Sequence, residues 1–245
     1  PPAGLSTGRG FICYTKAMKK SIRKGRFIVI DGTDGSGKGT QTKLLVERLK
    51  KEGKDVVELD FPQYGNPSAW FVEKYLRGEY GTAEEVGPYR GSLFFALDRF
   101  DKSFEVRKWL DEGKVVISNR YVSANMGHQT GKIKGKVARD KYLEWLFNLE
   151  FEICGIPKPD KIVLLYMPPE VGQKLVDEKA AREYTKGKKR DIHEADLSHL
   201  KNAADAYAYV AKKYKWDVVI CAKGDKILSR EEIHDILWNT IKKSL

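Results

Sequence analysis

The chain has 245 residues, of which 41% are hydrophobic and 32% charged, enough for one large α/β domain with a sizeable core. No apolar run approaches the roughly 20 residues that a membrane-spanning helix needs. The formal net charge of +11 predicts attraction to polyanions, which include nucleic acid, an anionic membrane surface and nucleotide phosphates.

Five short apolar runs predict the strands, and they are continuous rather than alternating. This pattern is typical of strands buried on both faces of a parallel sheet. In chain order they cover residues 26–30, 55–59, 114–118, 161–166 and 217–221. Helical stretches lie between and after them, at residues 40–53, 66–81, 91–113, 139–155, 197–215 and 229–245.

This alternation predicts right-handed βαβ units and a five-stranded parallel sheet flanked by helices, with ligands at the carboxyl ends of the strands. We expect one domain over residues 25–245. Its only break in regularity is a basic polar segment, which we interpret as a lid over about residues 180–195. Met18 is a natural beginning, so we expect residues 1–24 to form a poorly ordered extension.

The first predicted strand runs into the segment GTDGSGKGTQ, residues 32–41, and then into a helix. Glycine in such a turn serves either tight packing or phosphate binding. Without side chains, the backbone N–H groups can turn toward an anion at the helix N-terminus, and Lys38 can reach the outer phosphates. We predict that ATP phosphates bind to Gly32, Thr33, Asp34, Gly35, Ser36, Gly37, Lys38, Gly39 and Thr40.

The phosphate loop departs from the strict pattern at one position. The residue after the lysine should carry a hydroxyl group that contacts the metal ion, but here it is Gly39. The hydroxyl comes one residue later, so Thr40 is the candidate metal contact.

Five motifs together give the chain a family resemblance: RFIVIDGTDGSGKGTQTKLLVERL, DFPQYG, FFALDRF, NRYVSANMGHQTGK and DIHEADL. Over residues 25 to 240 the chain resembles the thymidylate kinases. The resemblance implies a phosphate-loop NTPase fold and transfer of the γ-phosphate of ATP, with Mg²⁺, to dTMP. It also implies a homodimer, to which the apolar segment FFALDRFDKSFEVRKWL would contribute a face.

The resemblance assigns the acceptor site residue by residue. Asp34 matches the acidic residue that faces the 3′-hydroxyl of dTMP. Phe61 belongs to the Phe-Pro-x-Arg segment, in which Tyr64 stands where an arginine is usual. Phe95 would stack on thymine, and Arg99, four residues later on the same helix face, would donate to a ring carbonyl.

The third strand leads into further acceptor residues. Arg120 would clamp the acceptor phosphate, a bidentate task that suits arginine. Asn119 replaces the usual aspartate, which weakens its link to the metal or phosphate network. Asn125 and Gln129 carry amides that can pair with a base edge, whereas we expect His128 to pack nearby rather than act as a base.

The lid would supply positive charge, because the phosphate loop itself carries no arginine. Arg182 and Arg190 are the candidate catalytic cations there, and the alternative is a solvated basic segment. The enzymatic alternative to a dTMP kinase is a kinase of the same fold for dUMP, dCMP or AMP. A nucleic-acid-binding protein would suit the net charge, but the chain has no motif typical of one.

Three widely spaced cysteines, Cys13, Cys154 and Cys221, form no Cys-x-x-Cys pair. They argue against a zinc site or a disulfide framework and fit a reducing cytoplasm.

Overall fold

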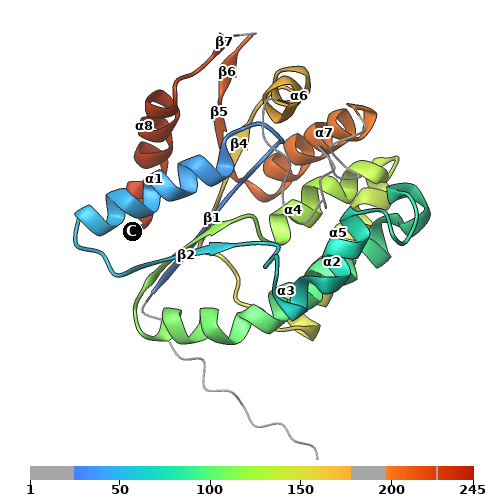
Figure 1. Ribbon diagram of the computed structural model, residues 1–245, viewed down its shortest axis with the longest axis horizontal. Helices are drawn as coiled ribbons and strands as arrows, with labels where there is room; N and C mark the ends of the chain where they lie inside the picture. Colours follow the sequence, from blue (N-terminus) through green and yellow to red (C-terminus); the bar gives the residue numbers. More distant parts are fainter. Residues whose placement is uncertain (1–24, 178–196, 225) are drawn as a thin grey trace, which may run out of the picture.

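The computed structural model describes residues 25–177, 197–224 and 226–245. Five strands form a parallel sheet in the order β2-β3-β1-β4-β5, which confirms the predicted fold class (Figure 1). The strands are β1 (Arg26–Gly32), β2 (Val56–Asp60), β3 (Val115–Asn119), β4 (Lys161–Tyr166) and β5 (Asp217–Ile220). Each predicted strand matches one of these to within two residues at either end.

Helices cover both faces of the sheet, as Figure 1 shows. They are α1 (Lys38–Lys51), α2 (Trp70–Leu76), α3 (Ala83–Asp111), α4 (Val122–His128), α5 (Lys136–Phe147), α6 (Pro169–Asp177), α7 (Leu197–Tyr214) and α8 (Arg230–Ile241). Shorter turns are η1 (Pro67–Ala69), η2 (Thr130–Lys132), η3 (Asn148–Ile153) and η5 (Lys242–Ser244). A small hairpin of β6 (Ala222–Lys223) and β7 (Lys226–Ile227) follows β5.

The central strand β1 shows why its sequence is apolar at every position. Ile28 and Ile30 belong to the core cluster that α1 and α8 cover. Phe27 and Val29 belong to the cluster on the other face, with residues of α3 and α5. Because successive side chains of a strand point to opposite faces, a strand buried on both faces needs an unbroken apolar run.

Helix α3 begins eight residues earlier than the sequence indicated. Thr82 caps it, with reciprocal bonds between the Thr82 and Glu85 side chains and the backbone. Gly87, at φ 73°, and Pro88 kink the helix before the predicted segment starts. The predicted helix 139–155 is also altered, because α5 passes into the wider π-helical turn η3.

The expected N-terminal extension and the whole of the expected lid, including Arg182 and Arg190, lie outside the described residues. Among the helices of the described ranges, none is long and apolar enough to cross a membrane.

Candidate active site

The phosphate loop joins β1 to α1 at the carboxyl edge of the sheet. Two of its glycines are required by packing: a Cβ on Gly32 would lie 2.2 Å from the Leu165 carbonyl oxygen, and one on Gly35 would lie 2.4 Å from the Gly172 carbonyl oxygen. Gly37 differs, because it has φ 80° and, apart from its chain neighbours, no atom of the described residues lies within 4 Å of its Cβ position. Both explanations of the glycines therefore apply, at different positions, and the open side at Gly37 suits a phosphate.

Lys38 is buried within this loop at the N-terminus of α1. Its Nζ donates to the carbonyl oxygens of Gly32 at 2.8 Å and Thr33 at 2.9 Å, and it lies 3.7 Å from Asp34 Oδ1. The ammonium group is thus positioned inside the loop by protein atoms alone. The partial positive charge of the helix N-terminus adds to it.

Arg120 directly follows β3 and reaches across to the same loop. Its Nη2 donates to Asp34 Oδ1 at 3.1 Å, so Asp34 lies between two cations. The backbone of Arg120 has φ 64°, an uncommon conformation for a non-glycine residue, and its N–H donates to the Ile30 carbonyl. Burial alone would lower the pKa of Arg120, but Asp34 and Asp31 outweigh it and raise the pKa further, so the charge is permanent.

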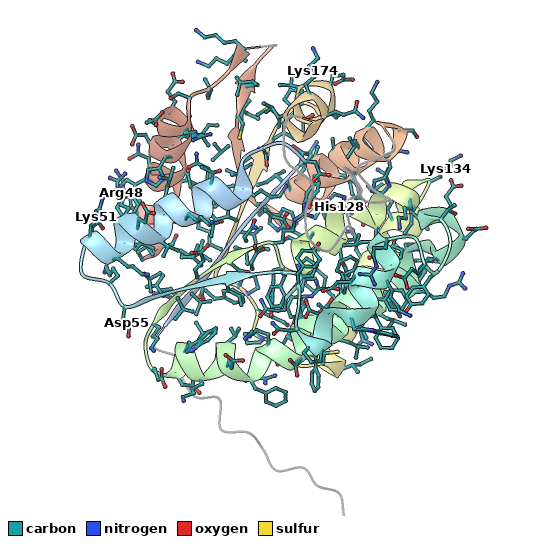
Figure 2. All side chains as sticks on the ribbon, viewed as in Figure 1. Arg48, Lys51, Asp55, His128, Lys134 and Lys174 are labelled. Atoms are coloured by element: carbon teal, nitrogen blue, oxygen red, sulfur yellow. The ribbon has the colours of Figure 1, made fainter. Side chains whose placement is uncertain are left out.

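His128 lies on α4, where this helix runs beside α7 (Figure 2). Its Nε2 is 3.3 Å from Arg120 Nη1, and its ring packs edge-on against Tyr207. Burial holds the pKa of His128 well below its usual value, so the ring is neutral. This agrees with the expectation that His128 packs near the site. A hollow beside it is bounded by Thr33, Asp34, His128, Pro169, Leu200, Ala203 and Tyr207.

The predicted base-reading residues gather between α3 and α4. Asn125 Nδ2 lies 3.4 Å from the Ser92 carbonyl oxygen, and Gln129 packs against Gly91 of the same helix turn. Gln129 Oε1 is buried and has no hydrogen-bond partner among the described atoms, which leaves one acceptor available. Phe95 lies one turn along α3 from Ser92, is half-buried and touches the edge of Tyr75.

Arg99 has a partner that the sequence did not reveal. Its Nε donates to Glu150 Oε2 at 3.2 Å, its Nη2 to Glu150 Oε1, and its Nη1 to the Tyr121 carbonyl oxygen at 3.4 Å. Both side chains are buried, with Glu150 at 0% and Arg99 at 2% exposure. Glu150 lies in the π-helical turn η3. The expected donor to the base is therefore part of an internal ion pair, and three of its N–H groups are already bonded.

Phe61 lies deeper than its motif indicated. Its ring is 3% exposed and packs in the core against Tyr121, with the ring centroids 5.5 Å apart. It directly follows β2, and its contact with dTMP stays a prediction. The neighbouring Tyr64, which replaces the usual arginine, is exposed.

A metal ion bound with ATP would lie between the first turn of α1 and the end of β3. Oxygen atoms are present there, but Gly39 and Asn119 replace the residues that are usual at their positions. Thr40 is exposed in the first turn of α1. Beyond the Cβ position of Gly39, the nearest atom is Asn119 Nδ2 at 3.8 Å, so there is room there. Asn119 Oδ1 is buried and has no hydrogen-bond partner in the described part of the chain. A divalent cation that prefers oxygen ligands fits this edge.

Asp60 completes that edge and was not singled out from the sequence. Asn119 Nδ2 donates to Asp60 Oδ1 at 2.9 Å. Although the Asp60 side chain keeps solvent contact, the surrounding protein raises its pKa to about 6 by burial. Among the described residues no group of three or more His, Cys, Asp or Glu side chains could hold a metal by itself, so substrate oxygens would have to complete the coordination.

Comparisons with known proteins identify the family and the fold. The family model for thymidylate kinase matches residues 30–233. The thymidylate kinase of Mycobacterium tuberculosis (strain H37Rv) is 32% identical over 186 residues, 75% of this chain and 85% of that protein. The thymidylate kinase of Bradyrhizobium sp. (strain ORS 278) is 28% identical over 94% of this chain and 95% of its own length. The solved structure of Candida albicans thymidylate kinase covers 90% of this chain and 92% of its own, with a TM-score of 0.69 and 19% identity, and supports the fold.

Proposed function

The chain belongs to the thymidylate kinase family and is an ATP:dTMP phosphotransferase, and we propose that Lys38, Asp34 and Arg120 carry its phosphoryl transfer. The observation that carries this assignment is their arrangement: one carboxylate lies between two buried or partly buried cations at the open phosphate loop. Such a transfer needs positioning and charge stabilisation rather than a covalent intermediate.

Each of the three residues has a separate task in this proposal. Lys38 and the loop N–H groups of residues 32–40 would hold the outer phosphates of ATP. Arg120 would hold the phosphate of dTMP and bring it in line with the γ-phosphate. Asp34 would fix the Arg120 guanidinium and accept a hydrogen bond from the 3′-hydroxyl of dTMP. Arg182 and Arg190 would add charge from the lid.

Residues of α3, α4 and the position after α4 would read the base. Phe95 would stack on thymine, while Asn125 and Gln129 would bond its polar edge. Arg99 would direct a remaining N–H to a ring carbonyl, held in place by Glu150. A donor at that point favours thymine and uracil over cytosine, whose amino group cannot accept a hydrogen bond.

A divalent cation, Mg²⁺, would accompany ATP at the edge formed by Thr40 and Asn119. When bound it would neutralise the phosphate charge. The buried, unpaired Asn119 Oδ1 and the space beyond Gly39 support this placement.

The exposed face of α3 supports a homodimer. Leu93, Leu97, Phe100 and Phe104 are 42%, 51%, 39% and 60% exposed and follow one another at helical spacing. A continuous apolar stripe of this size is costly in water unless another surface covers it. Light scattering at micromolar concentration should give twice the 27.9 kDa mass, and Phe104→Glu should lower it. A monomeric mass that is the same for the unmodified protein and for Phe104→Glu would contradict the proposal.

The free thiols of Cys154 and Cys221 fit the proposed cytoplasmic location.

A coupled ADP-release assay over a panel of acceptors tests the function. We expect dTMP to be the best acceptor, dUMP a poor one, and dCMP and AMP very poor. ADP release with AMP or dCMP at the level of dTMP would contradict the proposal. Salt-dependent DNA binding without ADP release from any acceptor would favour a nucleic-acid-binding protein instead.

A further inference from the structure

At the edge of the sheet that faces the nucleotide, the chain departs from the usual motifs at two positions next to the proposed metal ion. Gly39 stands where a hydroxyl residue follows the lysine in the strict phosphate-loop pattern, and Asn119 stands where an aspartate is usual. Mg²⁺ that is bound with ATP is usually held by one or two protein carboxylates together with the substrate phosphates. A replacement ligand at this edge rests on the proposed function, because it requires that the nucleotide bind together with a divalent cation.

A carboxylate lies at this edge on β2, the strand next to β3. Asp60 is the last residue of β2, and the sheet register places it opposite Asn119 at the end of β3. The 2.9 Å bond from Asn119 Nδ2 fixes the two side chains to each other. Asn119 Nδ2 is in turn the nearest atom to the Cβ position of Gly39. Asp60, Asn119 and the first turn of α1 are therefore contiguous.

The charge of Asp60 is unexpected at this place. A carboxylate repels phosphate groups, and two phosphate-bearing substrates meet at this edge in the proposed reaction. Arg120 contributes a favourable field, but its guanidinium bonds run to Asp34 and His128 rather than to Asp60. A cation between Asp60 and the phosphates would turn the repulsion into attraction.

The oxygen atoms available there suit such a cation. Mg²⁺ is usually held by only one or two protein carboxylates, with substrate phosphates and waters completing an octahedron. Asp60 supplies one carboxylate, and the unpaired Asn119 Oδ1 supplies a second oxygen. We propose that Asp60 replaces the β3 aspartate as the carboxylate that binds the nucleotide's divalent cation, directly or through one water, with Asn119 beside it.

Manganese affinity measured by electron paramagnetic resonance tests this without turnover. The probe is Mn²⁺, titrated into the protein saturated with a non-hydrolysable ATP analogue. Asp60→Asn should weaken Mn²⁺ binding about tenfold, because a metal-directed carboxylate is lost. In EDTA the same variant should bind the analogue as well as before or more tightly, since a negative charge has been removed.

Two further variants make the test specific. Glu58→Gln removes an exposed carboxylate from the same strand, two residues earlier, and should leave Mn²⁺ affinity unchanged. The exchange variant Asp60→Asn with Asn119→Asp restores the usual aspartate on β3 and should recover most of the lost affinity. If Asp60 only supports the fold, the exchange variant should not recover Mn²⁺ affinity.

The proposal is overturned if Asp60→Asn leaves Mn²⁺ affinity unchanged, or if it weakens analogue binding equally with and without metal. Should that variant not fold, a crystal of the unmodified protein with Mn²⁺ and ADP decides. We expect the metal to contact Asp60 directly or through one water, and a metal held elsewhere would refute the idea. Because no acceptor is used, loss of dTMP phosphorylation and loss of the Asp60 site remain distinguishable.

Discussion

The two ends of the site are built in different ways. At the phosphate end, Lys38, Asp34 and Arg120 come from a turn and a strand end, and their charges face an open loop. At the base end, Arg99 and Glu150 are buried and bonded to each other between helices. Backbone geometry thus organises the phosphate end, whereas side-chain packing organises the base end. We expect substitutions at the phosphate end to change only the rate of phosphoryl transfer. Substitutions at the base end should change both the stability of the fold and the selectivity for the acceptor base.

The largest effect is expected at the phosphate end. Lys38→Ala should lower kcat by about 10³-fold or more, because the ammonium group is needed most as charge shifts during transfer. Unfolding by urea should be changed little, since the hydrogen bonds of the lysine to the Gly32 and Thr33 carbonyls lie within the phosphate loop. A near-normal kcat in this variant would refute the role assigned to the phosphate loop.

At the base end, we expect substitution of the buried ion pair to lower the free energy of unfolding. Glu150→Ala leaves the Arg99 charge buried without its partner and should cost about 3–5 kcal/mol of unfolding free energy. Replacing the pair together, as Arg99→Met with Glu150→Leu, should recover most of that loss, because no unpaired charge then remains. Urea denaturation measures both. If the double variant were no more stable than Glu150→Ala, the ion pair would not explain the cost.

Selectivity should follow from the same pair. A donor that faces cytosine's amino group without a partner costs roughly 1–3 kcal/mol, so dTMP should be preferred over dCMP by about one to two orders of magnitude. Arg99→Gln with Glu150→Gln keeps a hydrogen-bonded pair but gives it acceptor capacity and no charge. The ratio of kcat/KM for dTMP to that for dCMP should fall. An unchanged ratio would show that Arg99 does not read the base.

A smaller effect, on the pH dependence of stability, is expected at Lys132, which lies in η2 beside Tyr75. Its Nζ donates to the Tyr75 hydroxyl at 2.6 Å and to the Ala83 carbonyl at 3.1 Å. Burial lowers the pKa of Lys132 to about 7. Below pH 7 both the folded and unfolded chains carry this proton. Between pH 7 and the pKa of about 10.4 that lysine has in the unfolded chain, only the unfolded chain carries the proton. The free energy of unfolding therefore rises with pH by at most about 1.4 kcal/mol per pH unit.

Lys132→Met isolates that contribution. The free energy of unfolding of the variant should exceed that of the unmodified protein most below pH 7. This difference should shrink between pH 7 and pH 9. Urea unfolding at pH 6.5, 7.5 and 8.5 follows the difference. A constant difference across these pH values would mean that Lys132 is charged throughout.

The phosphate end could be predicted from the sequence because glycine and lysine spacing specifies a backbone shape. The buried runs around residues 26–30 and 114–118 also place Lys38 and Arg120 at the same edge of a parallel sheet. Asp60 was within reach of that reasoning, since it directly follows the predicted strand 55–59 and its neighbour Asn119 follows strand 114–118. The strand order needed to pair them was not predicted.

Glu150 could not have been found in the same way. It lies 51 residues from Arg99 in a segment with helical apolar spacing, and the π-helical turn that holds it leaves no sequence pattern. Phe61 shows a related limit, because its motif indicated a ligand contact but did not reveal that its ring packs in the core. Residue spacing describes a backbone, but it does not reveal which distant side chain fills the space beside a buried charge.

Calorimetric titration of dTMP, without ATP, into two variants tests the division between the two ends most directly. Lys38→Ala should bind dTMP with nearly the affinity of the unmodified protein, because its lysine serves the phosphates of ATP. Arg99→Gln with Glu150→Gln should bind it about tenfold or more weakly, from the loss of one charged hydrogen bond. Equal weakening in both variants, or weakening only in Lys38→Ala, would contradict the account.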